Sequence, residues 1–220
     1  MDIPIHGAAT VIPEDLGYLM RTGLFRQIPL TGWSSVVVGS GSKAADFPLL
    51  LQVNTGVTGN STANASLAAR GMGRGQTYNI CDFDRPLIIV ADIGRAGSYV
   101  NAVHRFQLKN AVLVADMTAP GIGINILNNA LWAESFGSVR GIVDLGVICN
   151  PNVINRIAMV LEPGKSIKWY VNESFVGAQT DLTKIPSGTI TGNFNFSTSN
   201  PGAGGIDTYA MMTRLETWQA

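Results

Sequence analysis

Trp132 and Glu134 are the two residues of this sequence whose types and spacing best suit ligand binding. They lie two positions apart in the segment Leu-Trp-Ala-Glu-Ser-Phe-Gly, so on a strand their side chains share a face. An aromatic ring can stack on a sugar ring, and a neighbouring carboxylate can accept hydrogen bonds from its hydroxyl groups. The pair therefore predicts a sugar-binding surface. The alternative is a half-exposed strand whose Trp132 packs beneath a loop.

Further polar residues on predicted strands extend this surface. If Trp169 points into a core, Tyr170 must face outward, because successive strand residues alternate. Arg105, Gln107 and Asn125 are expected to line the same face and to form a concave polar sheet. The alternative is an ordinary solvated strand face, which has the same sequence pattern. The predicted ligand-binding residues are Trp132, Glu134, Tyr170, Arg105, Gln107 and Asn125.

The sequence predicts no catalytic residues. Asp82 and Asp84 lie two apart, a spacing that would let two carboxylates share one strand face. The sequence Asp84-Arg85-Pro86 instead favours a turn, with Asp82 as a hydrogen-bonding residue at a strand end. The Gly-Met-Gly-Arg-Gly segment at 71–75 lacks the Lys-Ser/Thr of a phosphate-binding loop, and it indicates another turn.

No cofactor is predicted either. The two histidines, His6 and His104, are too few for a zinc site. Calcium is the alternative to no metal, because carboxylates near predicted loops can bind it. These carboxylates are Asp116, Asp144, Asp181 and Asp207. Cys81 and Cys149 lie in apolar segments and are predicted to be free buried thiols, with a single disulfide as the alternative.

The composition excludes some partners. Charged residues make up 14% of the chain and the formal net charge is zero. There is thus no basic surface for nucleic acid and no basic amphipathic face for a membrane. With 46% hydrophobic residues, we expect a large core and self-association into a homo-oligomer.

Targeting signals are not recognised in the sequence. No apolar run approaches the roughly 18 residues of a membrane span, and the N-terminus lacks the basic and apolar regions of a signal peptide. A cytoplasmic or virion protein is therefore expected rather than a secreted one, and the compartment stays open.

Short apolar runs separated by turn residues predict a single all-β domain over residues 1–220. Residues 1–30 have little periodicity and are expected to form an irregular arm, with at most a turn of helix at 13–21. Residues 197–205 are expected to form a flexible loop. The predicted strands are 33–38, 47–53, 65–72, two within 78–93, 103–108, 121–127, 131–136, 141–148, 154–161, 167–171, 189–196 and 209–218.

The segment Ser-Ile-Lys-Trp-Tyr-Val-Asn-Glu-Ser-Phe-Val-Gly, followed by Lys-Ile-Pro, resembles a hairpin of concanavalin A-like jelly rolls of the laminin-G and legume-lectin type. Glu173 stands where that family often has glycine. The resemblance covers about residues 102–219, and it implies a β-sandwich of two antiparallel sheets with ligands on the concave sheet. Glucan hydrolases of this fold carry a Glu-x-Asp-x-x-Glu strand, which is absent here.

These observations predict a non-enzymatic, lectin-like carbohydrate-binding module. The alternative is a structural or assembly protein of the virion, coat or tail type that forms a homo-oligomer. A third candidate is a glycan-active hydrolase or lyase with a noncanonical site. The strand assignment also predicts that Trp169→Ala destabilises the fold strongly and Tyr170→Ala only slightly.

Overall fold

The computed structural model describes residues 26–38, 43–47, 50–56, 60–68, 80–96, 101–110, 116–200 and 209–219. The helical turn expected at 13–21, the glycine-rich segment at 71–75, His6, Asp207 and most of the expected arm lie outside these residues. Within the described segments, no helix is long and apolar enough to cross a membrane.

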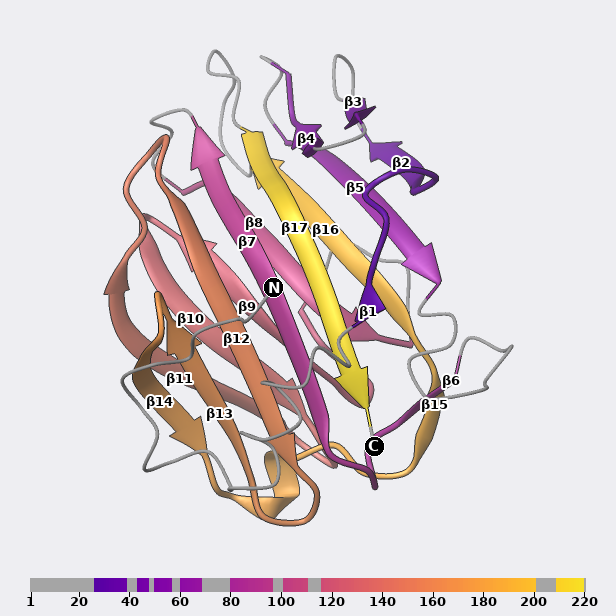
Figure 1. The fold of residues 1–220 in the computed structure, drawn as a ribbon. Helices are drawn as coiled ribbons and strands as arrows, with labels where there is room; N and C mark the ends of the chain where they lie inside the picture. Colours follow the sequence, from indigo (N-terminus) through magenta and orange to yellow (C-terminus); the bar gives the residue numbers. More distant parts are fainter. Residues whose placement is uncertain are drawn as a thin grey trace.

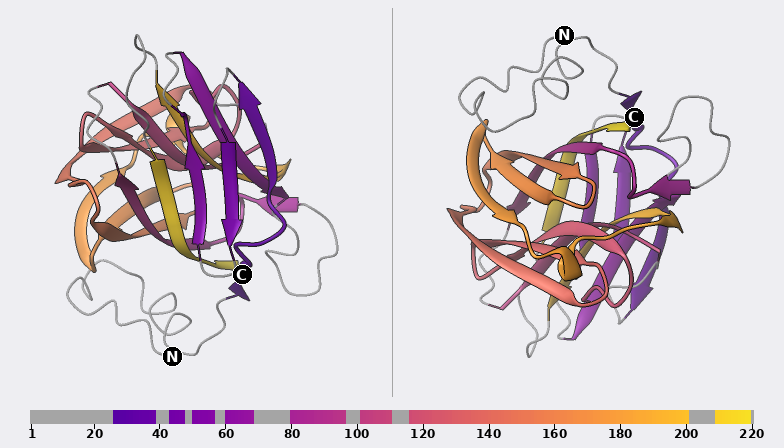
Figure 2. Two further views of the ribbon diagram at one scale, coloured as in Figure 1. Left: turned by 90° about the horizontal axis from the view of Figure 1, so that it is seen from above. Right: turned by 90° about the horizontal axis from the view of Figure 1, so that it is seen from below.

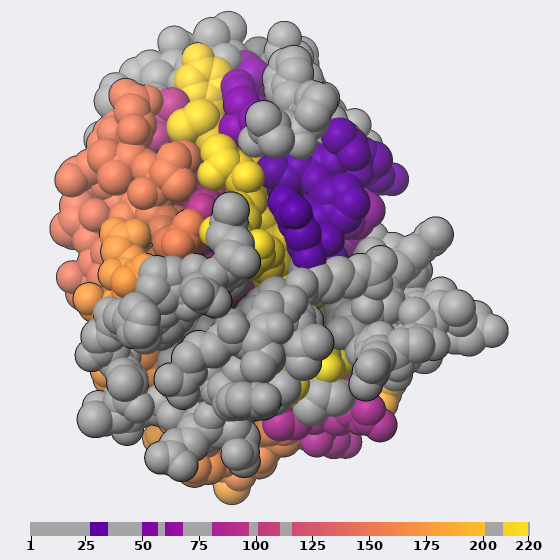
Figure 3. Space-filling model, viewed as in Figure 1, coloured from indigo at the N-terminus to yellow at the C-terminus, as the bar shows by residue number. Residues whose placement is uncertain are grey.

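Two antiparallel sheets contain almost all described strands (Figure 1). Sheet A has eight strands, in the order β14-β13-β12-β7-β17-β4-β3, and β1 also pairs with β17. Its strands are β1 (Arg26–Gln27), β3 (Lys43–Phe47), β4 (Leu50–Asn54), β7 (Leu87–Ala96), β12 (Ile154–Glu162), β13 (Ser166–Val171), β14 (Ser174–Gln179) and β17 (Tyr209–Gln219). In the space-filling view, β17 (yellow) runs between the orange strands and the indigo strands (Figure 3).

Sheet B has seven strands, in the order β11-β10-β9-β8-β16-β5-β2. Its strands are β2 (Ser34–Val38), β5 (Ser61–Ala68), β8 (Val103–Lys109), β9 (Gly121–Leu127), β10 (Ala130–Phe136), β11 (Arg140–Ile148) and β16 (Asn193–Asn200). A short pair, β6 (Ile80–Asp82) and β15 (Thr189–Thr191), lies beside the sandwich, and η1 (Leu182–Lys184) is a single 3-10 turn. The all-β fold with two antiparallel sheets is thus as predicted.

The core lies between the two sheets, which form facing layers (Figure 2). Strand alternation builds it: Ile122, Ile124 and Ile126 of β9 point inward, as expected from their spacing. Phe106 of β8 and Phe194 of β16 stack with ring centroids 6.1 Å apart. The core therefore fixes which face of sheet B points outward.

His104 also points away from the outer face of sheet B. One ring nitrogen, Nδ1, lies 2.8 Å from the Thr198 hydroxyl. Burial, together with the charges of nearby Arg95 and Arg105, lowers the pKa of His104 to about 3. The ring is therefore neutral in the folded protein at ordinary pH.

The hairpin at the centre of the family resemblance is present. β13 and β14 pair antiparallel around a two-residue turn, in which Val171 faces Ser174. Both turn residues have positive φ, 48° at Asn172 and 72° at Glu173, as the tight hairpin turn that matches strand twist requires. Trp169 is fully buried in the core, as predicted.

Several predicted boundaries are wrong. The segment 47–53 is split by the β3–β4 hairpin, and 189–196 is divided between β15 and β16. Ser197 to Asn200 continue β16 and are not part of a loop. At the end of the expected arm, Arg26 and Gln27 pair with β17, and Ile28 and Leu30 are buried in the core. Backbone pairing, which local periodicity does not record, decides each of these cases. β3 pairs with its neighbour β4, and the other segments pair with strands distant in the sequence.

The two aspartates of the 82–84 segment hold a turn, and the two cysteines are buried. The Asp82 carboxylate accepts from the Asp84 amide and pairs with Arg85, while the Asp84 carboxylate accepts from the Gly188 amide. This is the turn that the sequence favoured. Cys81 and Cys149 are free and buried, and burial raises the pKa of Cys81 to about 12 and that of Cys149 to about 11.

Candidate functional site

The outer face of sheet B, which points away from sheet A, brings together five of the six predicted site residues. Residues directly opposite each other on neighbouring strands share a face. The pairing registers therefore define three rows across β16, β8, β9, β10 and β11. The rows are Ser197-Arg105-Asn125-Trp132-Asp144, Asn195-Gln107-Gly123-Glu134-Ile142 and Asn193-Lys109-Gly121-Phe136-Arg140.

Glu134 is the centre of this face and is fully buried, with 0% exposure. One carboxylate oxygen accepts from Gln107 Nε2 at 2.7 Å and from Asn125 Nδ2 at 2.9 Å. The other accepts from the Met117 amide at 2.9 Å and from Arg140 Nε at 2.7 Å. The exposure expected for Glu134 is therefore wrong, and so is that expected for Gln107 and Asn125, which are 1% and 8% exposed. The Glu134 carboxylate instead holds these side chains in place.

Gly123 lets the Gln107 side chain reach Glu134. In the second row, Gly123 lies directly between these two residues. A Cβ on Gly123 would lie 2.4 Å from the Phe106 carbonyl oxygen and 2.9 Å from Gln107 Cγ. Any side chain there would displace the backbone or push Gln107 away from the carboxylate. This glycine is a functional position that the sequence analysis missed.

An ion-pair network continues from Glu134 to the surface. Arg140 Nη1 lies 2.9 Å from Asp116 Oδ2, and Arg105 Nη2 lies 3.3 Å from Asp116 Oδ1. Asp116 is half exposed, whereas Arg105 is mostly covered. The network fixes the two guanidinium groups beside the face and leaves the Asp116 carboxylate accessible to solvent.

Lys109 adds a third cation to this face but is itself buried. Burial lowers its pKa to about 8, although the charge of Glu134 acts in the opposite direction. Lys109 therefore loses its charge more readily than an exposed lysine does.

Trp132 is, like Phe136, a partly exposed aromatic residue of the face. Its cross-strand neighbours are Asn125 on β9 and Asp144 on β11. Asp144 is exposed and accepts a hydrogen bond from the Gly146 amide at 2.9 Å. Asn125 is buried and donates to Glu134, so beside the Trp132 ring the exposed Asp144 carboxylate is the polar contact. The sequence analysis missed Asp144 as a neighbour of Trp132, because a bulge in β11 shifts the register there.

Tyr170 does not belong to this site. It lies on β13 in sheet A, opposite Ala158 and Phe175, and it is only 1% exposed. Its ring makes an edge-on contact with Phe175, with centroids 5.8 Å apart. The expectation that Tyr170 is exposed and shares a face with Arg105, Gln107 and Asn125 is therefore wrong. The small effect expected for Tyr170→Ala rested on that exposure and is replaced by the larger loss expected for a buried ring.

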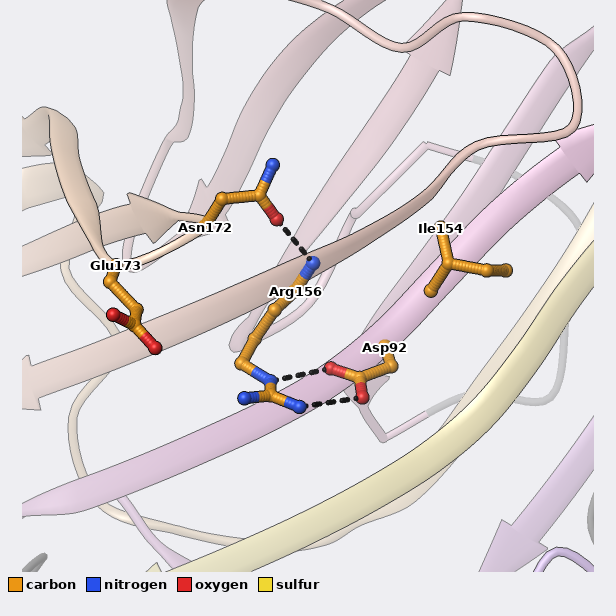
Figure 4. Close-up of a pocket in the computed structure, with 5 residues that line it drawn as sticks. All are labelled: Asp92, Ile154, Arg156, Asn172 and Glu173. Carbon is orange, nitrogen blue, oxygen red and sulfur yellow. Dashed lines mark hydrogen bonds and ion pairs between the residues drawn. The ribbon is translucent and has the colours of Figure 1, made fainter. Parts of the chain in front are cut away.

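A separate pocket of about 300 Å³ lies on sheet A, between β7, β12 and the β13–β14 turn. It is lined by Asp92, Ile154, Arg156, Asn172 and Glu173 (Figure 4). Arg156 donates two hydrogen bonds to the Asp92 carboxylate, at 2.8 and 3.0 Å, and its backbone amide donates to the Asn172 side chain. These contacts already pair the pocket's cation and anchor the hairpin turn to β12.

Metal ligands do not converge in the described part of the chain: it holds no group of three or more His, Cys, Asp or Glu side chains suited to a metal ion. Asp181, one of the expected calcium ligands, instead accepts hydrogen bonds from Thr183 and pairs with Lys184 at 3.0 Å.

No family model and no curated protein matches the sequence. Solved structures do match the fold. A β-glucanase of Bacillus licheniformis covers 90% of this chain and 100% of its own, with a TM-score of 0.58 and 16% identity. An endo-β-1,4-glucuronan lyase of the fungus Trichoderma reesei covers 90% and 95%, with a TM-score of 0.57 and 12% identity.

The carbohydrate-recognition domain of Emp47p gives a similar match. It covers 89% of this chain and 91% of its own length, with a TM-score of 0.56 and 12% identity. Identities this low report the fold alone. The chain has the concanavalin A-like jelly-roll fold, as its hairpin predicted.

Proposed function

We propose that this protein is a non-enzymatic carbohydrate-binding module that binds a glycan on the outer face of sheet B. The observation that carries the proposal is the position of Trp132, a partly exposed ring between Asn125 and Asp144 on a polar face. A sugar ring presents an apolar face for stacking on Trp132 and hydroxyl groups that can donate to the exposed Asp144 carboxylate.

The buried network beneath the face supports binding by preorganised side chains. Glu134 fixes Asn125 and Arg140, and Asp116 fixes Arg105. Side chains held in place before binding lose less conformational entropy on binding a ligand, which raises affinity. Nucleic acid and membranes are not proposed as partners, because the chain has zero formal net charge.

The state of the carboxylates favours binding over hydrolysis. Glycosidases of this kind need one carboxyl group to donate a proton and another to attack or to activate water. Glu134 is buried and saturated by four donors, and Asp116 is paired with two arginines. To act on a substrate, Glu134 would have to break these buried contacts and Asp116 would have to leave its two arginines.

A glycan array followed by calorimetric titration of the best ligand tests the proposal. Trp132→Ala should weaken binding at least about fivefold, because stacking on an aromatic ring contributes about 1 kcal/mol. Phe175→Ala is the matched control, since Phe175 is an exposed aromatic on sheet A. Absence of any glycan ligand, or equal losses in both variants, would refute the proposal.

An assembly role is the second candidate function. It is favoured by the exposed edge strand β11, where Ile142 and Ile148 are 50% and 60% exposed. A protein with this role would bind no glycan and would form oligomers through that strand.

A further inference from the structure

β11 forms an open edge of sheet B. Among the described strands it pairs only with β10, and it lies at the left side of the sandwich in Figure 1, near β14. β14 packs against the inner face of β11, where Gly177 lies close to the side chain of Leu145. An unpaired edge presents backbone donors and acceptors that can pair with another strand.

The outward side chains of β11 have an arrangement suited to pairing with an identical strand. Arg140, Ile142 and Asp144 share the outer face, because they lie opposite Phe136, Glu134 and Trp132. They form a cation, an exposed aliphatic residue and an anion at equal spacing. In an antiparallel pair of two such strands centred on Ile142, each Arg140 lies opposite Asp144 of the other copy.

We propose that β11 is an interface at which two copies of this chain join into one continuous sheet, with a twofold axis at Ile142. Two Arg140–Asp144 pairs would flank an Ile142–Ile142 contact. Opposite charges directly across antiparallel strands stabilise the pair, and two-fold interfaces use the same patch on both subunits.

In the described structure, Arg140 and Asp144 each keep one side-chain atom that can bond to the second copy. The contacts of Arg140 use Nε and Nη1, which leaves Nη2 for an acceptor from the second copy. Asp144 uses Oδ1 to accept from the Gly146 amide, which leaves Oδ2. Since Ile142 is 50% exposed, pairing would also remove apolar surface from water.

The corresponding edge of sheet A lacks this complementarity. β14 has the sequence Ser-Phe-Val-Gly-Ala-Gln, with no charged residue. Pairing of two β14 strands would therefore gain no cross-strand ion pairs. Charge complementarity thus favours β11 over β14 as the interface, and a second copy rather than an unrelated strand as its occupant.

This pairing would place the outer faces of two B sheets side by side. If the face binds a glycan, the dimer is bivalent for a repeating ligand, and linked sites can raise apparent affinity by about 10²–10⁴. The dimer interface does not depend on that activity. Because the ladder spans only the segment from Arg140 to Asp144, we expect a dissociation constant in the micromolar range.

Sedimentation velocity across a concentration series measures the association. The mass should rise from 23.3 kDa toward twice that value as concentration passes through the micromolar range. Ile142→Lys places two like charges at the axis, and it should weaken dimerisation at least about 100-fold. Circular dichroism should stay unchanged, since Ile142 is exposed. A wild-type monomer at all concentrations, or an Ile142→Lys dimer of unchanged strength, would overturn the proposal.

Cysteine cross-linking tests the register independently of affinity. At the twofold axis, Ile142→Cys would face its own copy at about 4.5–5.5 Å between Cα atoms, a distance that a disulfide can bridge. Mild oxidation should therefore give a covalent dimer. Val153→Cys is the control, because Val153 is similarly exposed but lies outside β11. Equal cross-linking of the two variants would exclude this register.

Discussion

Substitution of Glu134 tests the buried network, because two variants remove different numbers of its contacts. Glu134→Gln keeps one oxygen for the Met117 amide and Arg140. Its new amide nitrogen can donate to Asn125 Oδ1, which lacks a partner in the described structure, once that amide turns over. The variant then loses the charge and the hydrogen bond from Gln107 Nε2, and hydrogen bonds to charged groups contribute about 1.5–3 kcal/mol. We expect Glu134→Gln to lower the free energy of unfolding by about 2 kcal/mol.

Glu134→Ala should destabilise more, because it leaves the amides of Gln107 and Asn125 and the Met117 N–H without their acceptor. Removing one member of a buried ion pair destabilises by about 3–5 kcal/mol, so we expect about 4 kcal/mol. Urea denaturation followed by tryptophan fluorescence, with an unchanged m value, measures both losses. Glu173→Gln, on the hairpin turn, is the control and should stay within about 0.5 kcal/mol of wild type. Losses below about 1 kcal/mol in both Glu134 variants would show that the carboxylate is solvated and the network absent.

Three further predictions concern the rest of the fold. Trp169→Ala and Tyr170→Ala should each lower the free energy of unfolding by about 3–5 kcal/mol, because both rings are buried; denaturant titration measures both, and a small loss at Tyr170 would contradict its burial. His104 has a folded-state pKa of about 3, below its unfolded value, so its contribution is present at neutral pH and is lost as the pH falls from about 6.5 toward 3. Between about pH 7.5 and pH 5.5, this effect should lower the free energy of unfolding of the wild type by about 1.4 kcal/mol. Urea denaturation at the two pH values should show no such loss for His104→Gln. Glu173→Gly should raise the melting temperature by a few degrees, because glycine adopts the positive φ of the turn without strain; an unchanged or lower value would contradict the turn geometry.

The hairpin shows what local sequence could predict. Alternation placed Trp169 in the core and Tyr170 on the opposite side of β13, and both assignments are confirmed. Alternation says only which side of its own strand a residue occupies. That β13 joins sheet A through β12, and not the sheet of Trp132, depends on pairing between distant segments. The sequence therefore put Tyr170 with the wrong neighbours.

The exposure of Glu134 was wrongly predicted for a similar reason. Its strand and its face were predicted correctly, and it shares that face with Arg105, Gln107 and Asn125. Its other partners, the Met117 amide and Arg140, lie before β9 and after β10, and no periodic pattern marks them. One signal was available: the glycines at alternate positions in Gly-Ile-Gly-Ile-Asn-Ile-Leu face outward, where missing side chains indicate close approach.

The order of strands has a consequence for how the protein folds. β16 and β17 come late in the sequence, yet each lies inside its sheet: β16 between β8 and β5, and β17 between β7 and β4. Until these two strands are in place, each sheet is divided into two parts with unpaired inner edges, which favour aggregation. The pairs that join the parts link segments far apart in the sequence, so the insertion of β16 and β17 should limit the rate of folding.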